Sequence, residues 1–158
     1  MTINKRKNWR SLRGHRVASG RKAFELLALS QFALKDFANA SNTAHDAIRL
    51  GVVADWPTLY DYYQNRERYV QQFNALRDYV DSNPGSENGV FLLAYHNLML
   101  GHYDDAQKRF AKVHELNPND QIAQEQFNQL QQQHEVSRIP CPRLRSRKTN
   151  NKFDLGLN

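Results

Sequence analysis

Several residue types are scarce in this chain of 158 residues, and each scarcity excludes a class of protein. The single cysteine, Cys141, excludes an internal disulfide framework and a zinc site built from cysteines alone. No apolar run approaches the roughly 18 residues that a transmembrane helix needs, and no apolar stretch of a secretory signal follows the basic start. One thiol fits a reducing compartment, so we expect a cytoplasmic protein.

Motifs that would indicate catalysis or nucleotide binding are also missing. There is no G-x-x-x-x-G-K-[ST] loop and no G-x-G-x-x-G turn, although a triad assembled in space would leave no such motif. His96 and His102 lie six residues apart, a spacing that does not suit two metal ligands on one helix, and we expect both to be partly exposed. His45 and His114 have no neighbouring cysteine or carboxylate pattern. We therefore predict a non-enzymatic protein with no catalytic residue, no metal and no cofactor.

The formal net charge of +6 is distributed unevenly along the chain. Residues 1–22 carry eight lysines and arginines and no acid, and residues 138–158 carry six against one acid. Residues 23–137 hold the other eight bases and fifteen acids, so this middle part is acidic. Neither end has a sustained helical or alternating apolar period. We expect a basic flexible N-terminal arm (1–22), one folded domain (23–137) and a basic disordered tail (138–158).

Apolar residues in the middle part recur with a helical period, and no stretch predicts a strand. Breaks between the helices are marked by glycine, by proline and by residues that cap helices, such as Asp55 before Trp56-Pro57. The pattern predicts seven helices joined by short turns, within 23–34, 37–50, 55–65, 66–81, 89–100, 104–116 and 121–136. Tyr60 and Tyr63 share a helical face and Tyr62 points away, so at least one of these tyrosines should face solvent or a partner.

A repeat within these helices indicates how they stack. Asn83-Pro84 and Asn117-Pro118 lie 34 residues apart, and each pair closes a predicted helix. Between them, Leu93-Ala94 is followed by Gly101, Tyr103 and Ala106-x-x-x-Phe110, which resembles a tetratricopeptide repeat (TPR). Two weaker repeats precede it, and the run 91–102 also resembles that of bacterial TPR-containing proteins. The resemblance implies an all-α fold in which antiparallel helix pairs stack as a short right-handed superhelix, with about three repeats and a C-terminal cap helix.

The same resemblance implies a binding surface. In the TPR family the first helix of each repeat lines a concave groove, and the corresponding residues here are apolar or mildly acidic. We expect a hydrophobic or basic peptide to bind there, because the Lys and Asn pattern that clamps a terminal carboxylate in some members is not evident. The implied partner-binding residues are Leu29, Phe32, Asp61, Gln64, Asn65, Phe91, Tyr95, Leu98 and Met99.

The sequence thus favours a scaffold that binds a peptide or protein segment through the concave face of a TPR-like array. The alternative is a nucleic-acid-associated protein whose basic arms contact phosphates. Against it, the arms contain few aromatic residues for base stacking, and the acidic middle part would repel phosphate. Self-association through an exposed terminal face of the array stays open.

Overall fold

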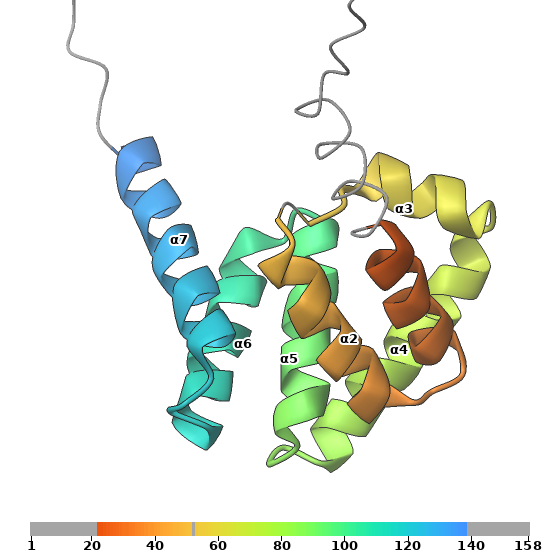
Figure 1. Ribbon diagram of the computed structural model, residues 1–158, viewed down its shortest axis with the longest axis horizontal. Coiled ribbons are helices and arrows are strands. Elements are labelled where there is room, and N and C mark those ends of the chain that lie inside the picture. The colour runs from red at the N-terminus through yellow and green to blue at the C-terminus, as the bar shows by residue number, and fades with distance from the viewer. Residues whose placement is uncertain (1–21, 52, 139–158) are drawn as a thin grey trace, which may run out of the picture.

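The computed structural model describes residues 22–51 and 53–138, and all regular elements in these ranges are α-helices (Figure 1). The predicted arms therefore lie almost entirely outside the described residues. The prediction of seven helices is confirmed, because an N-terminal helix over residues 22–33 precedes six others. These are α2 (Phe37–Arg49), α3 (Trp56–Tyr63), α4 (Arg66–Ser82), α5 (Glu87–Met99), α6 (Tyr103–Leu116) and α7 (Gln121–Arg138).

Local residues explain where these helices begin and end. Asp55 caps α3 by accepting a hydrogen bond from the backbone N–H of Thr58 at 3.1 Å, as its position before Trp56-Pro57 predicted. Asn65 caps α4 in the same way, through the N–H of Arg68. Gly101 has a φ of 75°, which a residue without Cβ adopts at no steric cost, and it follows the end of α5. The boundaries thus follow from chemistry within a few residues of each end.

The register of the last helices repeats every 34 residues. α5 begins at Glu87 and α7 at Gln121, and the C-caps of α4 and α6 are Asn83 and Asn117. α5 packs against α6, and α6 packs against α7, as consecutive members of a TPR-like array. The helices and this register show the all-α, TPR-like fold that the sequence resemblance implied.

The N-terminal helix and α2, together called the N-terminal hairpin, pack across this array. α2 lies against α5 and touches α7, and the N-terminal helix lies beside α4 (Figure 1). His45 of α2 stacks on Phe91 of α5 with ring centroids 3.4 Å apart, and Phe32 approaches His96 at 4.1 Å. As a result nearly the whole of α5 is buried. Only Glu87 and Asn88 at its start and Leu98 near its end are half-buried.

No helix in residues 22–51 and 53–138 combines the length and the apolar character that crossing a bilayer demands.

Candidate partner-binding groove

Five of the nine side chains predicted to face a concave groove are buried in the core. The N-terminal hairpin supplies apolar and aromatic side chains to the faces of α5 that the family pattern would leave open to a partner. The sequence pattern did not predict this intramolecular cover, because the residues of the hairpin were interpreted as the first repeat of the array. The buried members of the predicted set are Leu29, Phe32, Phe91, Tyr95 and Met99.

The other four predicted residues stay at least partly accessible. Asp61, Gln64 and Asn65 are exposed where α3 turns into α4, and Leu98 is half-buried near the end of α5. Gln64 has a φ of 50° at the end of α3, and Asn65 uses its side chain to cap α4. These two residues therefore already have a structural role in the turn between the helices. The structure therefore brings three of the polar residues together at one turn, but it does not join them to the apolar members as one open surface.

His96 is fully buried, so the expectation of partial exposure was wrong for this residue. Its Nδ1 lies 3.1 Å from the hydroxyl of Tyr69, and its Nε2 has no hydrogen-bond partner in the described structure. Desolvation by burial lowers the pKa of His96 to about 3, so the ring is neutral at physiological pH. His102 is exposed, as expected. The helical period placed His96 on α5, but it could not show that α5 is covered on so many sides.

His45 does have a carboxylate partner, contrary to the expectation, because Asp120 approaches it in space. Nε2 of His45 lies 2.9 Å from Oδ2 of Asp120, and Nδ1 lies 2.8 Å from the backbone carbonyl oxygen of Ser41. Both ring nitrogens of His45 thus lie within hydrogen-bond distance of an oxygen atom of the protein. Asp120 also accepts hydrogen bonds from the N–H groups of Ile122 and Ala123 at the start of α7. This arrangement joins two helices and leaves no ring nitrogen for a ligand.

The tyrosines of α3 divide between solvent and core, which confirms the prediction that at least one of them faces outward. Tyr60 is 48% exposed, whereas Tyr63 is half-buried and donates a hydrogen bond to Oε1 of Gln72 at 2.7 Å. Burial raises the pKa of Tyr63 to about 12. Of the three tyrosines of α3, Tyr60 is therefore the exposed one, and Tyr62 and Tyr63 are half-buried.

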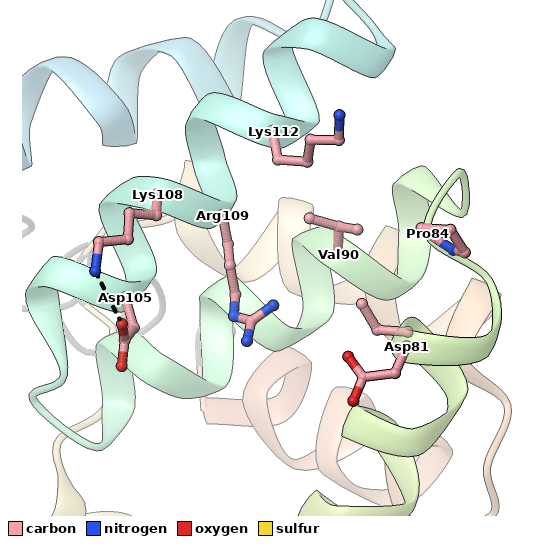
Figure 2. Close-up of a pocket in the computed structure, with 8 residues that line it drawn as sticks. Asp81, Pro84, Val90, Asp105, Lys108, Arg109 and Lys112 are labelled. Carbon is pink, nitrogen blue, oxygen red and sulfur yellow. Dashed lines mark ion pairs between the residues drawn. The ribbon is translucent and has the colours of Figure 1, made fainter.

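An open groove of about 470 Å³ lies between the end of α4, the start of α5 and α6. Its apolar part comes from Val80, Pro84 and Val90, and α6 contributes cationic side chains along one wall (Figure 2). The groove thus lies between α4 and α6, the second helices of two successive repeats, with Val90 of α5 in its lining, and it contains none of the nine predicted residues. The residues that line it are Val80, Asp81, Pro84, Val90, Asp105, Lys108, Arg109 and Lys112.

Two of the three cations on this wall are already paired. Nζ of Lys108 lies 3.6 Å from Asp105, and Nζ of Lys112 lies 2.8 Å from Glu115. Both lysines are exposed, so each pair contributes less than about 1 kcal/mol to stability. Each lysine therefore lies beside a carboxylate of its own helix at the edge of the groove. Arg109, the third cation of this wall, is not neutralised by these pairs.

Arg109 differs from its neighbours because it makes no ion pair within the part of the chain that the structure describes. Its Nε is buried and has no hydrogen-bond partner there. Desolvation is the largest influence on its pKa and lowers it; Arg77 acts in the same direction, while Asp105 and Asp81 act against it. The guanidinium nevertheless stays charged at neutral pH. Sequence analysis missed this residue because a basic residue on an amphipathic helix is ordinarily a solvated one.

The titratable side chains of the described ranges could form a metal site only where several ligands lie close together. No three histidine, cysteine, aspartate or glutamate side chains in residues 22–51 and 53–138 lie close enough together to hold a metal ion.

Comparisons with known proteins show a structural likeness to solved helical proteins. No protein-family model matches the chain, and no curated protein matches it at a significant level. The chain is similar to a solved structure described as "Crystal Structure of P58(IPK) TPR Domain at 2.5 A", with 15% sequence identity and a TM-score of 0.41. The match covers 86% of this chain and 40% of that one, so this chain spans less than half the length of its solved neighbour. The TPR-like assignment rests on the helices and their 34-residue register.

Proposed function

We propose that this protein is a non-enzymatic scaffold that binds a peptide or protein segment. The observation that supports this most directly is the open groove between α4, α5 and α6, which combines an apolar floor with charged side chains at its edge. Concave surfaces of this composition suit recognition of another chain, because apolar contact supplies affinity and a few placed charges select the partner. The groove lies in a helical array, where neighbouring repeats hold its walls in place.

The groove replaces the concave face as the main site of this proposal. The apolar residues predicted for the concave face are mostly buried, and two of them, Leu29 and Phe32, belong to the N-terminal hairpin itself. His45 of the hairpin stacks on Phe91, so a partner would have to displace it to reach that ring. Asp61, Gln64 and Asn65 remain as a secondary polar surface beside Tyr60. The alternative of nucleic-acid binding depends on the basic arms, which lie outside the described residues, and it stays a prediction.

The proposal is tested by affinity capture with the full chain as bait. The groove variant Lys108→Glu/Lys112→Glu reverses two exposed charges at the groove edge, and the control variant Arg49→Glu/Arg68→Glu reverses two exposed charges on α2 and α4. We expect proteins that are retained by the wild type and by the control to be lost from the groove variant. Retention of the same proteins by all three baits would show that the groove is not their binding site.

A further inference from the structure

Arg109 is the feature of the groove that neither the fold nor the packing explains. Its long side chain extends from α6 into the groove, on the wall opposite Asp81 (Figure 2). The neighbouring lysines have carboxylate partners at 3.6 and 2.8 Å, whereas Arg109 has none in the described part of the chain. Its Nε is withdrawn from solvent without a hydrogen bond. A buried donor without an acceptor is costly in a free protein, and a carboxylate bound to the terminal nitrogens of the guanidinium would offset part of that cost.

The surroundings of Arg109 restrict what such an acceptor can be. Three cations and two carboxylates line the groove, so its formal charge is only about +1. A nucleic-acid backbone requires several cations that neutralise successive phosphates, and this groove offers one unpaired guanidinium. A basic segment would bring like charge to Arg109. One carboxylate matches the charge, because the planar guanidinium fork pairs with carboxylates in bidentate geometry.

The floor of the groove determines which kind of side chain in the ligand can lie next to that carboxylate. Val80 and Val90 are buried at 6% and 3% exposure, and Pro84 adds an exposed apolar ring at the rim. A ligand that filled the groove with polar groups alone would desolvate them against these side chains without hydrogen bonds. An apolar side chain beside the carboxylate would instead bury its surface there.

We propose that the groove binds a peptide segment in which an aspartate or glutamate adjoins an apolar residue. The carboxylate pairs with Arg109, and the apolar side chain packs on Val80, Pro84 and Val90. Lys108 and Lys112 attract the segment to the groove through longer-range electrostatics. This inference rests on the proposed scaffold function and names the chemistry of its partner.

The test is an NMR titration of the isotopically labelled full chain with three capped peptides. The first repeats the unit Leu-Asp-Leu, and the other two replace its aspartate by asparagine or by lysine. We expect the aspartate peptide to shift the amide signals of Val90, Arg109 and their neighbours. We expect the asparagine peptide to bind about tenfold more weakly, because it lacks the charge, and the lysine peptide to leave these signals unchanged.

Variants of Arg109 show whether this residue sets the preference. Arg109→Met removes the charge and keeps the aliphatic stem, and we expect it to bind the aspartate and asparagine peptides equally. Arg109→Lys should restore part of the preference, since it returns the charge without the planar fork. Arg49→Met on α2 serves as the control and should bind like the wild type. The amide spectrum of each variant reports whether it is folded.

The outcomes separate this inference from the proposed function. If the aspartate peptide shifts no groove signals, or if Arg109→Met retains the preference for aspartate, the assignment of Arg109 as a carboxylate site is wrong. In that case groove-dependent capture of protein partners would still support the scaffold function. If the groove variant also loses no captured protein, both proposals fail.

Discussion

At the scale of single residues, the buried His96 and the half-buried Arg109 have opposite relations to their surroundings. His96 sits among the rings of Phe32, Tyr69 and Phe73, with centroid separations of 4.1, 5.8 and 6.2 Å, and it tolerates burial by staying neutral. Arg109 cannot become neutral and has no partner in the described structure. A neutral buried base belongs to the core, whereas an unpaired guanidinium at a groove suggests that something outside the chain completes it.

The first prediction concerns the pH dependence of stability. The pKa of His96 is about 3 in the folded chain against 6.5 in the unfolded one, so the unfolded chain binds more protons between these values. Stability from this group is therefore full above pH 6.5 and is lost as the pH falls towards 3. The slope reaches at most about 1.4 kcal/mol per pH unit. In urea unfolding measured between pH 3 and pH 6.5, His96→Asn should reduce the slope of the unfolding free energy against pH. Equal slopes for the wild type and the variant would argue against a neutral buried ring.

The second prediction concerns the stability contribution of Arg109. Arg109→Met keeps the aliphatic contacts and removes an unpaired charge, so we expect the free energy of unfolding to stay within about 0.5 kcal/mol or to rise. The measurement is urea unfolding at neutral pH. A loss of more than about 1 kcal/mol would mean that the guanidinium already has a structural partner.

At the scale of helices, the contact between α4 and α5 sets one wall of the groove. Gly89 lies in the first turn of α5 and is buried against the end of α4. A Cβ at this position would stand 2.9 Å from Cε1 of Tyr79 and 3.2 Å from Cγ2 of Val80. The absence of a side chain therefore allows the close approach of these helices and keeps Val80 and Val90 together at the floor.

The third prediction tests this approach. Gly89→Ala gains up to about 1 kcal/mol of helix propensity, but overpacking costs about 1–3 kcal/mol, so we expect a net loss of roughly 1 kcal/mol. Gly85→Ala is the matched control, because nothing lies within 4 Å of a Cβ there, and it should change stability by less than about 0.5 kcal/mol. Thermal unfolding of both variants measures the difference. Equal stabilities would show that α4 and α5 can separate at little cost.

Individual helices could be predicted from the sequence because their signals are local. Asp55 before Trp56-Pro57, Gly101 after the end of α5, and the two Asn-Pro pairs each act within a few residues. The packing of the hairpin could not be predicted, because it depends on contacts such as His45 with Asp120 that lie 75 residues apart. The groove was missed for the same reason, since Val80 and Arg109 meet only after α4 and α6 have folded against α5.

At the scale of the whole molecule, the N-terminal hairpin packs across the array that the later helices form. Asp120 takes part twice, since one carboxylate oxygen caps α7 and the other pairs with His45 of α2 at 2.9 Å. The first hairpin and the last helix are thereby connected across α5. The side chains that the hairpin covers are not accessible at the surface, whereas the groove between α4, α5 and α6 is open and, within the described residues, contains a guanidinium without an ion pair.

The fourth prediction separates the two roles of Asp120. Asp120→Asn keeps an oxygen that can cap α7 and loses the carboxylate that pairs with His45. Asp120→Ala loses both roles. We expect the asparagine variant to lose about 1–2 kcal/mol and the alanine variant about 1 kcal/mol more, the usual worth of an N-cap. Urea unfolding at neutral pH measures both values. An asparagine variant as stable as the wild type would show that the contact between Asp120 and His45 does not stabilise the fold.

Binding of a partner in the groove between α4, α5 and α6 is tested by the affinity of a captured partner for three forms of the full chain. We predict that Lys108→Glu/Lys112→Glu weakens the Kd by at least about tenfold, while Arg49→Glu/Arg68→Glu leaves it within about twofold of the wild type. Equal affinity for all three forms would contradict binding in the groove.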